Sequence, residues 1–258
     1  MTSDTTAFDL SGRTALVTGS SRGIGRRLAE GLSAAGATVV VHGRSAVAAS
    51  AAAEQIAGRT GNPVFAEAFD VTDEDGVDGG LSRIEARHGV PDILVNNAGM
   101  QLRAPITEFT AADWNTLVAT NLTSAFLLSR RVAAGMIARG SGRIVNIGSV
   151  QSQLARPGIA PYSATKGGIV MLTKGLCADL APHGITVNSL APGYFATELT
   201  KALVDDAEFS AWVAGRTPAG RWGDVGDLVG PLVFLASEAS AFVNGQILYV
   251  DGGMTAVV

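Results

Sequence analysis

A tyrosine and a lysine lie where they could act together on a proton. Pro161 suits the first turn of a helix, because its missing N–H has no partner there. Tyr162 and Lys166 then lie four residues apart on one helical face. A tyrosine with a pKa near ~10 is a poor base at neutral pH unless a nearby ammonium stabilises its phenolate. The pair predicts acid–base chemistry; the alternative is an exposed helix face.

A serine precedes this pair by thirteen residues. Ser149 directly follows the apolar stretch 143–148, which we expect to be a strand, so its hydroxyl could hold a substrate oxygen near Tyr162. Ser152 is a second candidate, but it lies further into the loop. We therefore expect Ser149 to polarise the reacting group.

Asparagines add two further candidates. Asn121 falls inside an expected helix over 110–138, where a buried amide could bind a water and relay protons from Lys166 to solvent. The segment 96–99 reads Asn-Asn-Ala-Gly after an apolar run, and its small residues would let a ligand approach the backbone. The expected catalytic set is Asn121, Ser149, Tyr162 and Lys166.

A glycine-rich loop follows the first expected strand, with the spacing GxxxGxG over 19–25. Glycines in such a loop allow a tight turn, a close approach of backbone to a pyrophosphate, and close helix packing, while N–H groups at the helix start face the phosphates. The loop predicts a dinucleotide site; a plain tight turn is the alternative. The residues expected to bind the cofactor here are Gly19, Ser21, Arg22, Gly23, Ile24 and Gly25.

The same loop also fits GxSxG, the nucleophile elbow of α/β-hydrolases, with Ser21 as nucleophile. A hydrolase needs a carboxylate and then a histidine later in the chain. His42 follows too soon, and His88 and His183 fall near expected helix ends. A hydrolase is therefore the weaker hypothesis.

The end of the second expected strand bears on which nucleotide binds. An acid there would hydrogen-bond the ribose 2′-hydroxyl of NAD, but the sequence reads His42-Gly43-Arg44. Arg44 and Arg22 could instead grip a 2′-phosphate, since a guanidinium binds phosphate bidentately. Two solvated loop charges are the alternative. The pattern favours NADP(H), with NAD(H) possible.

Short β-branched runs alternate with longer alanine- and leucine-rich stretches along the chain, which predicts right-handed βαβ units on a parallel sheet covered by helices on both faces. No linker or repeat interrupts them, so we expect one doubly wound domain over 1–258. The expected strands cover 13–18, 37–42, 63–69, 91–96, 142–148, 185–190 and 246–250. The expected helices cover 23–35, 45–58, 73–88, 110–138, 161–181, 198–214 and 224–236.

Composition narrows the class of protein. Of 258 residues, 47% are hydrophobic and 16% charged, which suits a large buried core. A net charge of −4 makes nucleic acid an unexpected partner. No His/Cys/Asp/Glu cluster has metal-ligand spacing. A lone cysteine and an N-terminus unlike a signal peptide lead us to expect a cytoplasmic protein with no membrane segment.

Taken together, these motifs resemble those of the short-chain dehydrogenase/reductase family. The matching segments span 18–25, 96–99, Asn121, Ser149, Tyr162 with Lys166, Pro192-Gly193 with Thr197, and 251–253. The resemblance implies a Rossmann-type α/β fold with a seven-stranded sheet in the order 3-2-1-4-5-6-7, and a homotetramer. It implies that Tyr162 is the acid/base and that Lys166 also binds the nicotinamide ribose. The other cofactor contacts that it implies are Asp70, Val71, Asn97, Ala98, Gly99, Pro192, Gly193 and Thr197.

Other segments resemble the gluconate 5-dehydrogenase (5-ketogluconate reductase) branch of that family, namely 149–153 with 155–157, 191–195, 216–223 and 242–245. This implies hydride transfer between nicotinamide and a secondary alcohol or ketone of a sugar acid. Its carboxylate would need cations, for which Arg103 and Arg156 are candidates, and Gln151 and Tyr194 could contact hydroxyls. Two alternatives stay open: a reductase of another ketone, such as a 3-oxoacyl thioester or a xenobiotic carbonyl, and a nucleotide sensor without catalysis.

Overall fold

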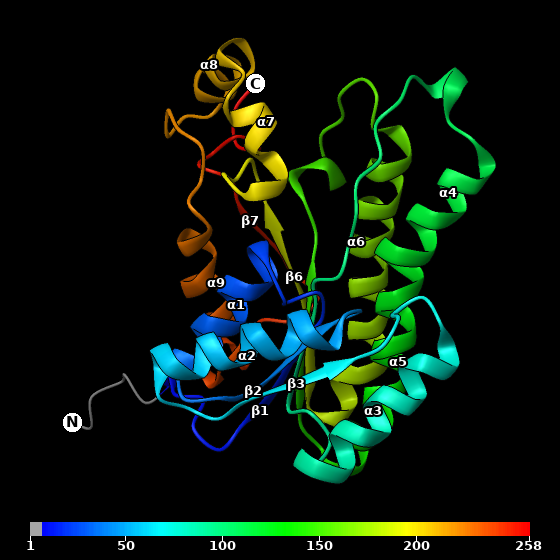
Figure 1. Ribbon diagram of the computed structural model, residues 1–258, viewed down its shortest axis with the longest axis vertical. Helices are drawn as coiled ribbons and strands as arrows, with labels where there is room; N and C mark the ends of the chain where they lie inside the picture. Colours follow the sequence, from blue (N-terminus) through cyan, green and yellow to red (C-terminus); the bar gives the residue numbers. More distant parts are fainter. Residues whose placement is uncertain (1–6) are drawn as a thin grey trace.

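Seven parallel strands form one sheet in the order β3-β2-β1-β4-β5-β6-β7 (Figure 1). The computed structural model describes residues 7–258, without the side chain of Leu199. The strands are β1 (Thr14–Val17), β2 (Thr38–Gly43), β3 (Val64–Ala68), β4 (Ile93–Asn96), β5 (Gly142–Ile147), β6 (Ile185–Pro192) and β7 (Ile247–Val250). The strand positions and the order expected from the sequence are confirmed.

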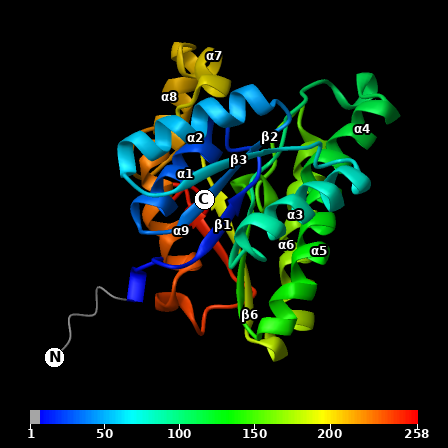
Figure 2. The same ribbon diagram turned by 60° about the horizontal axis from the view of Figure 1, so that its bottom comes forward.

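Helices cover both faces of the sheet (Figure 2). One layer contains α1 (Gly23–Ala34), α2 (Ala46–Thr60) and α9 (Val229–Ala236), and the other contains α3 (Glu74–His88), α5 (Ser124–Arg139) and α6 (Ala160–Leu180). Each layer encloses its own apolar core against the sheet. Covering both faces explains why β6 is buried along its whole length, including its polar residues Thr186, Asn188 and Ser189.

The strand order reverses between β1 and β4. β1 pairs with β2 on one side, Thr14 opposite Thr38, and with β4 on the other, Ala15 opposite Ile93. Connections leave the two central strands in opposite directions at such a point, so a crevice opens at their carboxyl ends. The glycine loop after β1 and the asparagine segment after β4 therefore meet at this crevice.

The expected helix over 110–138 is interrupted. It consists of α4 (Ala111–Val118), a π-helical turn (Ala119–Thr123) and α5. The turn contains Asn121, whose amide group hydrogen-bonds the backbone of Met100 in a neighbouring loop. A π turn adds one residue to the helical repeat and often marks a functional site. The sequence pattern does not show it, because its residues read as ordinary helix.

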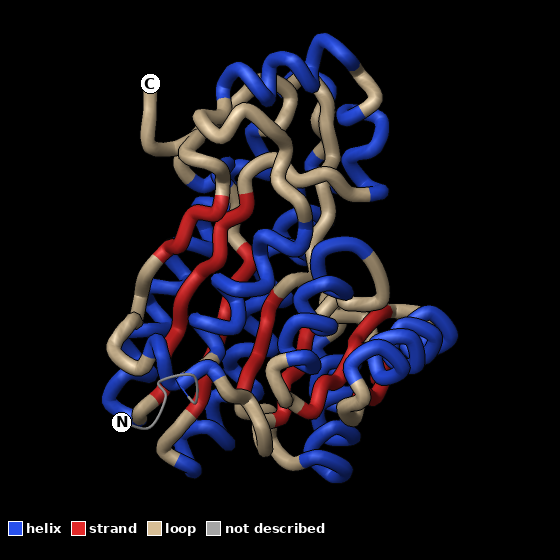
Figure 3. The backbone as a smooth tube through the Cα atoms, turned by 90° about the vertical axis from the view of Figure 1, so that its left-hand side faces the viewer, coloured by secondary structure: helices blue, strands red, loops and turns tan. Residues whose placement is uncertain are grey.

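The expected helix over 198–214 is also broken. It consists of a short 3₁₀ turn (Glu198–Thr200), α7 (Lys201–Val204) and α8 (Ala207–Arg216). Asp206 separates the last two, because its carboxylate accepts from the N–H groups of Glu208 and Phe209 and starts a new helix. These two helices form a small cap beyond the carboxyl ends of the strands (Figures 1 and 3). Within residues 7–258, no helix has the length and apolar character to cross a bilayer.

Candidate active site

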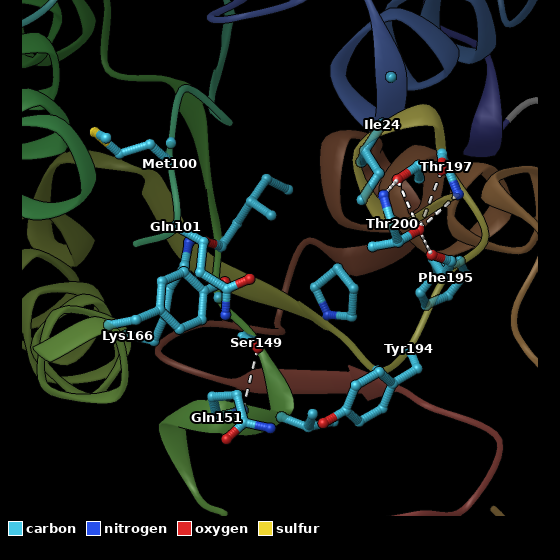
Figure 4. Close-up of a pocket in the computed structure, with 18 of the residues that line it drawn as sticks. Ile24, Met100, Gln101, Ser149, Gln151, Lys166, Tyr194, Phe195, Thr197 and Thr200 are labelled. Atoms are coloured by element: carbon cyan, nitrogen blue, oxygen red, sulfur yellow. Dashed lines mark hydrogen bonds between the residues drawn. The ribbon is translucent and has the colours of Figure 1, made fainter. Parts of the chain in front are cut away.

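A cavity of about 550 Å³ lies at the carboxyl ends of the strands (Figure 4). Its walls come from the loops after β1, β4, β5 and β6, together with the start of α6 and Leu203 of α7. The expected site residues that line it are Gly19, Arg22, Gly23, Ile24, Gly25, Asn97, Gly99, Arg103, Ser149, Gln151, Arg156, Tyr162, Lys166, Pro192, Gly193, Tyr194 and Thr197.

The glycine loop is held close to the segment after β4. A Cβ on Gly19, which has φ +63°, would lie 2.9 Å from Cα of Ala98, and one on Gly25 would lie 2.6 Å from the carbonyl oxygen of Gly19. Thr18 Oγ1 accepts from the N–H groups of Asn97 and Ala98, each at 3.0 Å. The Asn97 amide donates to the carbonyl oxygens of Thr18 and Gly19 at 2.8 and 3.2 Å. Asn97 and Ala98 therefore shape the loop, and Ala98 does not line the cavity.

The start of α1 suits an anion. Its N-cap residue, Arg22, makes no side-chain cap bond, and no acidic residue lies in the first turn. The N–H groups of a first helical turn lack intrahelical partners and carry the positive end of the helix dipole. Gly23 and Ile24 present this turn to the cavity. The residues present therefore fit a phosphate-bearing dinucleotide.

Lys166 and Tyr162 line the cavity from adjacent turns of α6. The ammonium nitrogen of Lys166 lies 5.7 Å from the centre of the Tyr162 ring and donates to the carbonyl oxygen of Ile147 at 2.7 Å. Burial lowers the pKa of Lys166 to about 8. Burial also raises the pKa of Tyr162, against the opposing effects of the Ser149 hydroxyl and the Arg103 guanidinium. Tyr162 is thus protonated at neutral pH and suited to donate a proton.

Ser149, not Ser152, faces the cavity. Ser149 has an extended backbone and begins the 3₁₀ turn Val150–Ser152, and its hydroxyl oxygen accepts from the N–H of Gln151 at 3.1 Å (Figure 4). Ser152 donates its hydroxyl inward to the carbonyl oxygen of Ser149 at 2.6 Å. The Ser149 hydroxyl thus lies beside the Tyr162 phenol, whose pKa it lowers, and both groups face the cavity.

Asn121 is buried at 3% exposure and does not line the cavity. Its carbonyl oxygen accepts from Met100 N–H at 2.8 Å, and its amide nitrogen donates to the Met100 carbonyl at 2.9 Å and to Thr165 Oγ1 at 3.2 Å. Its side chain therefore joins the π turn, the Met100 loop and α6. The proton relay expected for Asn121 stays a prediction.

All four expected substrate residues line the cavity. The guanidinium of Arg103 donates to Gln101 Oε1 at 2.9 Å, and that of Arg156 lies 5.5 Å from the centre of the Phe209 ring. Burial and the charge of Arg156 lower the pKa of Arg103. Proximity of two cations is costly unless an anion joins them.

Gln151 and Tyr194 have polar atoms still available to a ligand. Within the described part of the chain, the side-chain amide oxygen of Gln151 (Oε1) and the Tyr194 hydroxyl are buried and have no hydrogen-bond partner. Both residues line the cavity, and the Tyr194 hydroxyl points toward the side where Ser149 and Gln151 lie (Figure 4). Buried polar groups are normally paired, so these two are suited to a polar ligand.

An aromatic cluster, which the sequence did not indicate, holds Tyr194. The rings of Phe209, Trp212 and Trp222 lie 5.7–5.8 Å from the Tyr194 ring, each edge-on to it. Such edge-to-face contacts stabilise one ring orientation. The aromatic residues themselves were visible in the sequence, but their meeting with Tyr194 depends on how the cap folds back.

Besides Ala98, four expected cofactor residues lie outside the cavity lining: Ser21, Arg44, Asp70 and Val71. Ser21 Oγ would lie 3.2 Å from a Cβ on Gly43, so the glycine loop contacts the end of β2. Arg44 is exposed beside Asp70, whose pKa is lowered mainly by hydrogen bonds from Thr72 and also by the charge of Arg44. Val71 is packed in the core at 5% exposure.

The hydrolase alternative gains no support from this geometry. Among the described residues, no hydrogen bond joins Ser21 to a histidine. His42 is committed elsewhere, with its ring nitrogens bonded to Gly19 and Phe69. The described chain also contains no group of three or more His, Cys, Asp or Glu side chains that could hold a metal ion.

Comparison with known proteins agrees with this site. The family described as "Enoyl-(Acyl carrier protein) reductase" matches residues 19–255. Gluconate 5-dehydrogenase of Gluconobacter oxydans is 56% identical over 248 residues, covering 96% of each chain. The 5-keto-D-gluconate 5-reductase of Escherichia coli K12 is 48% identical, covering 97% of this chain and 98% of the relative. The crystal structure of a gluconate 5-dehydrogenase from Burkholderia cenocepacia, in complex with NADP and tartrate, superposes with a TM-score of 0.96 at 54% identity, covering 98% and 99% of the two chains. The chain therefore belongs to the short-chain dehydrogenase/reductase family.

Proposed function

We propose that this protein is an NADP(H)-dependent oxidoreductase that interconverts D-gluconate and 5-keto-D-gluconate. The observation that carries the proposal is one cavity that holds a Tyr–Lys–Ser acid–base group beside two arginines. The names of the similar dehydrogenase and reductase support the same substrate. Both names describe a reaction of a sugar acid, whose carboxylate could meet the two arginines of the cavity.

Arg103 and Arg156 are proposed to hold the substrate carboxylate. Both line the cavity, and the charge of Arg156 disfavours the protonated form of Arg103, so an anion between them would relieve their repulsion. Gln151 and Tyr194 would then contact the hydroxyl groups of the sugar chain through their unpaired polar atoms. A bound tartrate in the Burkholderia relative, itself a hydroxy acid, supports an acid-binding site.

The same cations argue against a 3-oxoacyl thioester. A thioester carries no carboxylate next to the reacting ketone, so it would leave both arginines without an anionic partner inside the cavity. An aromatic wall that holds a tyrosine hydroxyl toward the cavity also favours a polar substrate. A sugar acid fits the charge of the cavity better than an acyl chain.

NADP(H) is the proposed cofactor, with NAD(H) as a poorer one. The uncapped start of α1 suits the pyrophosphate. At the end of β2 the sequence His42-Gly43-Arg44 lacks the acid that would bind a 2′-hydroxyl, and Arg22 and Arg44 are exposed there to meet a 2′-phosphate. The NADP-bound relative agrees with this choice. The remaining contacts proposed from the family are Asp70, Val71, Asn97, Ala98, Gly99, Pro192, Gly193 and Thr197.

In the reducing direction, the bound cofactor supplies a hydride to the carbonyl carbon. Tyr162 donates its proton to the carbonyl oxygen, and the Ser149 hydroxyl hydrogen-bonds that oxygen as negative charge develops. The Lys166 ammonium stabilises the phenolate left on Tyr162, and we propose that it also binds the nicotinamide ribose. Reprotonation of Tyr162 is proposed to run through Lys166 and Asn121. In the oxidising direction the Tyr162 phenolate removes the alcohol proton.

The test is to follow absorbance of the reduced nicotinamide, with NADPH or NADH, against 5-keto-D-gluconate and a panel of other ketones. We expect NADPH to be oxidised much faster than NADH, with 5-keto-D-gluconate the best substrate. Activity only with 3-oxoacyl thioesters or neutral ketones would contradict the sugar-acid assignment. No oxidation with any ketone, combined with tight NADPH binding, would support a nucleotide sensor instead.

A homotetramer in the cytoplasm is proposed as the working form. Large apolar side chains are exposed along the outer helices at Trp114, Phe126, Ile137 and Met171, and α5 and α6 are long enough to form a helix–helix interface. Size-exclusion chromatography with light scattering tests the copy number. A monomer at micromolar concentration would contradict the assembly.

A further inference from the structure

His42 is a buried histidine that the proposed reaction does not use. It occupies the penultimate position of β2, beneath the glycine loop, with 2% of its surface exposed. It does not line the cavity, and with so little of it exposed it has almost no surface for either proposed ligand. Its hydrogen bonds nevertheless link two segments on which the cofactor would rest.

Both ring nitrogens of His42 have backbone partners. The Gly19 N–H donates to Nδ1 at 3.1 Å, and Nε2 lies 3.1 Å from the carbonyl oxygen of Phe69. Because an N–H only donates and a carbonyl only accepts, these partners require the neutral tautomer with the proton on Nε2. Burial agrees with this state, since it lowers the pKa of His42 to about 4.

Further contacts reinforce the link. The His42 backbone N–H donates to Ser20 Oγ at 3.0 Å, and the Ser20 N–H donates to the His42 carbonyl at 2.8 Å. The His42 ring also contacts the Phe69 ring, with centroids 4.1 Å apart. His42 is therefore joined to the loop after β1 by three hydrogen bonds and to the end of β3 by one.

The bond to Gly19 has a specific consequence. Gly19 has φ +63°, and both of its backbone groups are held, the N–H by His42 and the carbonyl by Asn97. The Gly19 N–H therefore points into the protein, and the groups left for phosphate are those at the start of α1. A buried N–H without an acceptor is costly, so removing Nδ1 would favour a different orientation of this peptide.

We propose that His42 is a positioning residue for the dinucleotide, which orients the glycine loop through its Nδ1 contact with Gly19. The second contact, with Phe69, fixes the segment that leads directly into Asp70 and Val71. The inference rests on the proposed cofactor. It adds that the affinity for this cofactor depends on a hydrogen-bond acceptor that never touches it.

Three substitutions separate the two contacts of the ring. His42→Asn keeps an acceptor at the δ position but loses the reach to Phe69. His42→Gln places its amide at the distance of Nε2, with no acceptor at the δ position. His42→Phe keeps the ring volume and its packing on Phe69 but has neither polar contact. The Kd of NADPH is measured for each by quenching of tryptophan fluorescence, and folding is checked by circular dichroism and urea unfolding.

We expect His42→Phe to weaken NADPH binding by about tenfold or more, because the Gly19 N–H loses its acceptor. His42→Asn should bind within about threefold of the wild type, while His42→Gln should resemble His42→Phe. The KM for NADPH should follow Kd, while kcat at saturating NADPH and the KM for the ketone stay within about twofold. If His42→Phe does not fold, the comparison of Asn with Gln decides.

Equal NADPH affinity in the Asn and Gln variants, or rescue by Gln and not by Asn, would overturn the Gly19 assignment while leaving the proposed function intact. A fall in kcat with no change in Kd would overturn it as well. Failure of the wild type to bind NADPH or NADH would instead overturn the proposed cofactor and this inference together.

Discussion

Lys166 donates its ammonium proton to the carbonyl oxygen of Ile147, at the end of β5, and not to the tyrosine one turn before it on α6. This bond places the ammonium 5.7 Å from the centre of the Tyr162 ring. The charge thus stands beside the phenol without forming an ion pair with it. Such an arrangement stabilises a transient phenolate while leaving the Tyr162 hydroxyl to the substrate.

Replacing Tyr162 with phenylalanine removes the proton donor and little else. We expect kcat for ketone reduction to fall about 10³-fold, because a positioned general acid contributes on the order of 10²–10⁴. The Kd of NADPH, measured by fluorescence, should change less than about threefold. Tyr194→Phe is the matched control, since it removes another buried hydroxyl of the same cavity and should affect mainly the KM of the sugar acid. Equal losses of kcat in the two variants would contradict the role of Tyr162.

Burial of Lys166 makes a prediction about stability. Its pKa is about 8 in the folded chain and near ~10.4 in the unfolded chain, so the unfolded state binds more protons between these values. The free energy of unfolding of the wild type should therefore rise, relative to that of Lys166→Met, as the pH increases from about 8 toward ~10.4. The gain is at most about 3 kcal/mol, at roughly 1.4 kcal/mol for each unit of pKa shift.

Urea unfolding of both proteins at pH 7 and pH 9.5 measures this difference. Lys174→Met is a suitable control, because it removes an exposed lysine from the same helix. A stability difference between the wild type and Lys166→Met that does not vary with pH would show that the lowered pKa is absent.

The arginine pair predicts a selective loss of affinity for acids. Replacing Arg103 or Arg156 with methionine removes a cation while keeping most of the chain length. We expect the KM for 5-keto-D-gluconate to rise about tenfold or more, since a charged hydrogen bond contributes about 1.5–3 kcal/mol. The KM for an uncharged ketose should change little.

Steady-state kinetics with both substrates check this expectation. Arg59→Met is the control, because Arg59 is an exposed residue on α2 that does not line the cavity. An equal increase of KM for the acid and for the neutral ketose would indicate a general disturbance of the cavity instead.

The choice between the two nicotinamide cofactors should depend on Gly43. An aspartate there would repel a 2′-phosphate and accept from a 2′-hydroxyl, so Gly43→Asp should shift the Kd ratio toward NADH by about tenfold or more. A Cβ at this position lies 3.2 Å from Ser21 Oγ, so Ser21 must move slightly. Gly43→Ala supplies the same Cβ without charge. If the alanine variant shifts the ratio as much as the aspartate variant does, charge is not the cause.

Local sequence patterns determined much of this protein. Alternating β-branched and alanine-rich stretches predicted the strand positions, because a strand covered on both faces, such as β4, is buried throughout and rich in apolar residues. The glycine spacing predicted the loop that approaches Ala98, and the four-residue interval predicted that Tyr162 and Lys166 share a helical face. Each of these depends on neighbours within a few residues, which a sequence displays directly.

Other features depended on contacts between distant segments. Asn121 reads as helix, yet its bonds to Met100 place it in a π turn. From the sequence, His42 was only a poor candidate for the catalytic histidine of a hydrolase. The packing of β2 between the glycine loop and the segment after β3 gave its two ring nitrogens their partners.

Tyr194 likewise meets Phe209 and Trp212 only because the cap, which carries both in α8, folds back over the strand ends. Side-chain orientation in such places follows from burial and from hydrogen bonds closed across the fold. Only the tertiary structure determines these orientations, because the spacing of nearby residues does not show which distant backbone N–H group will need a hydrogen-bond acceptor.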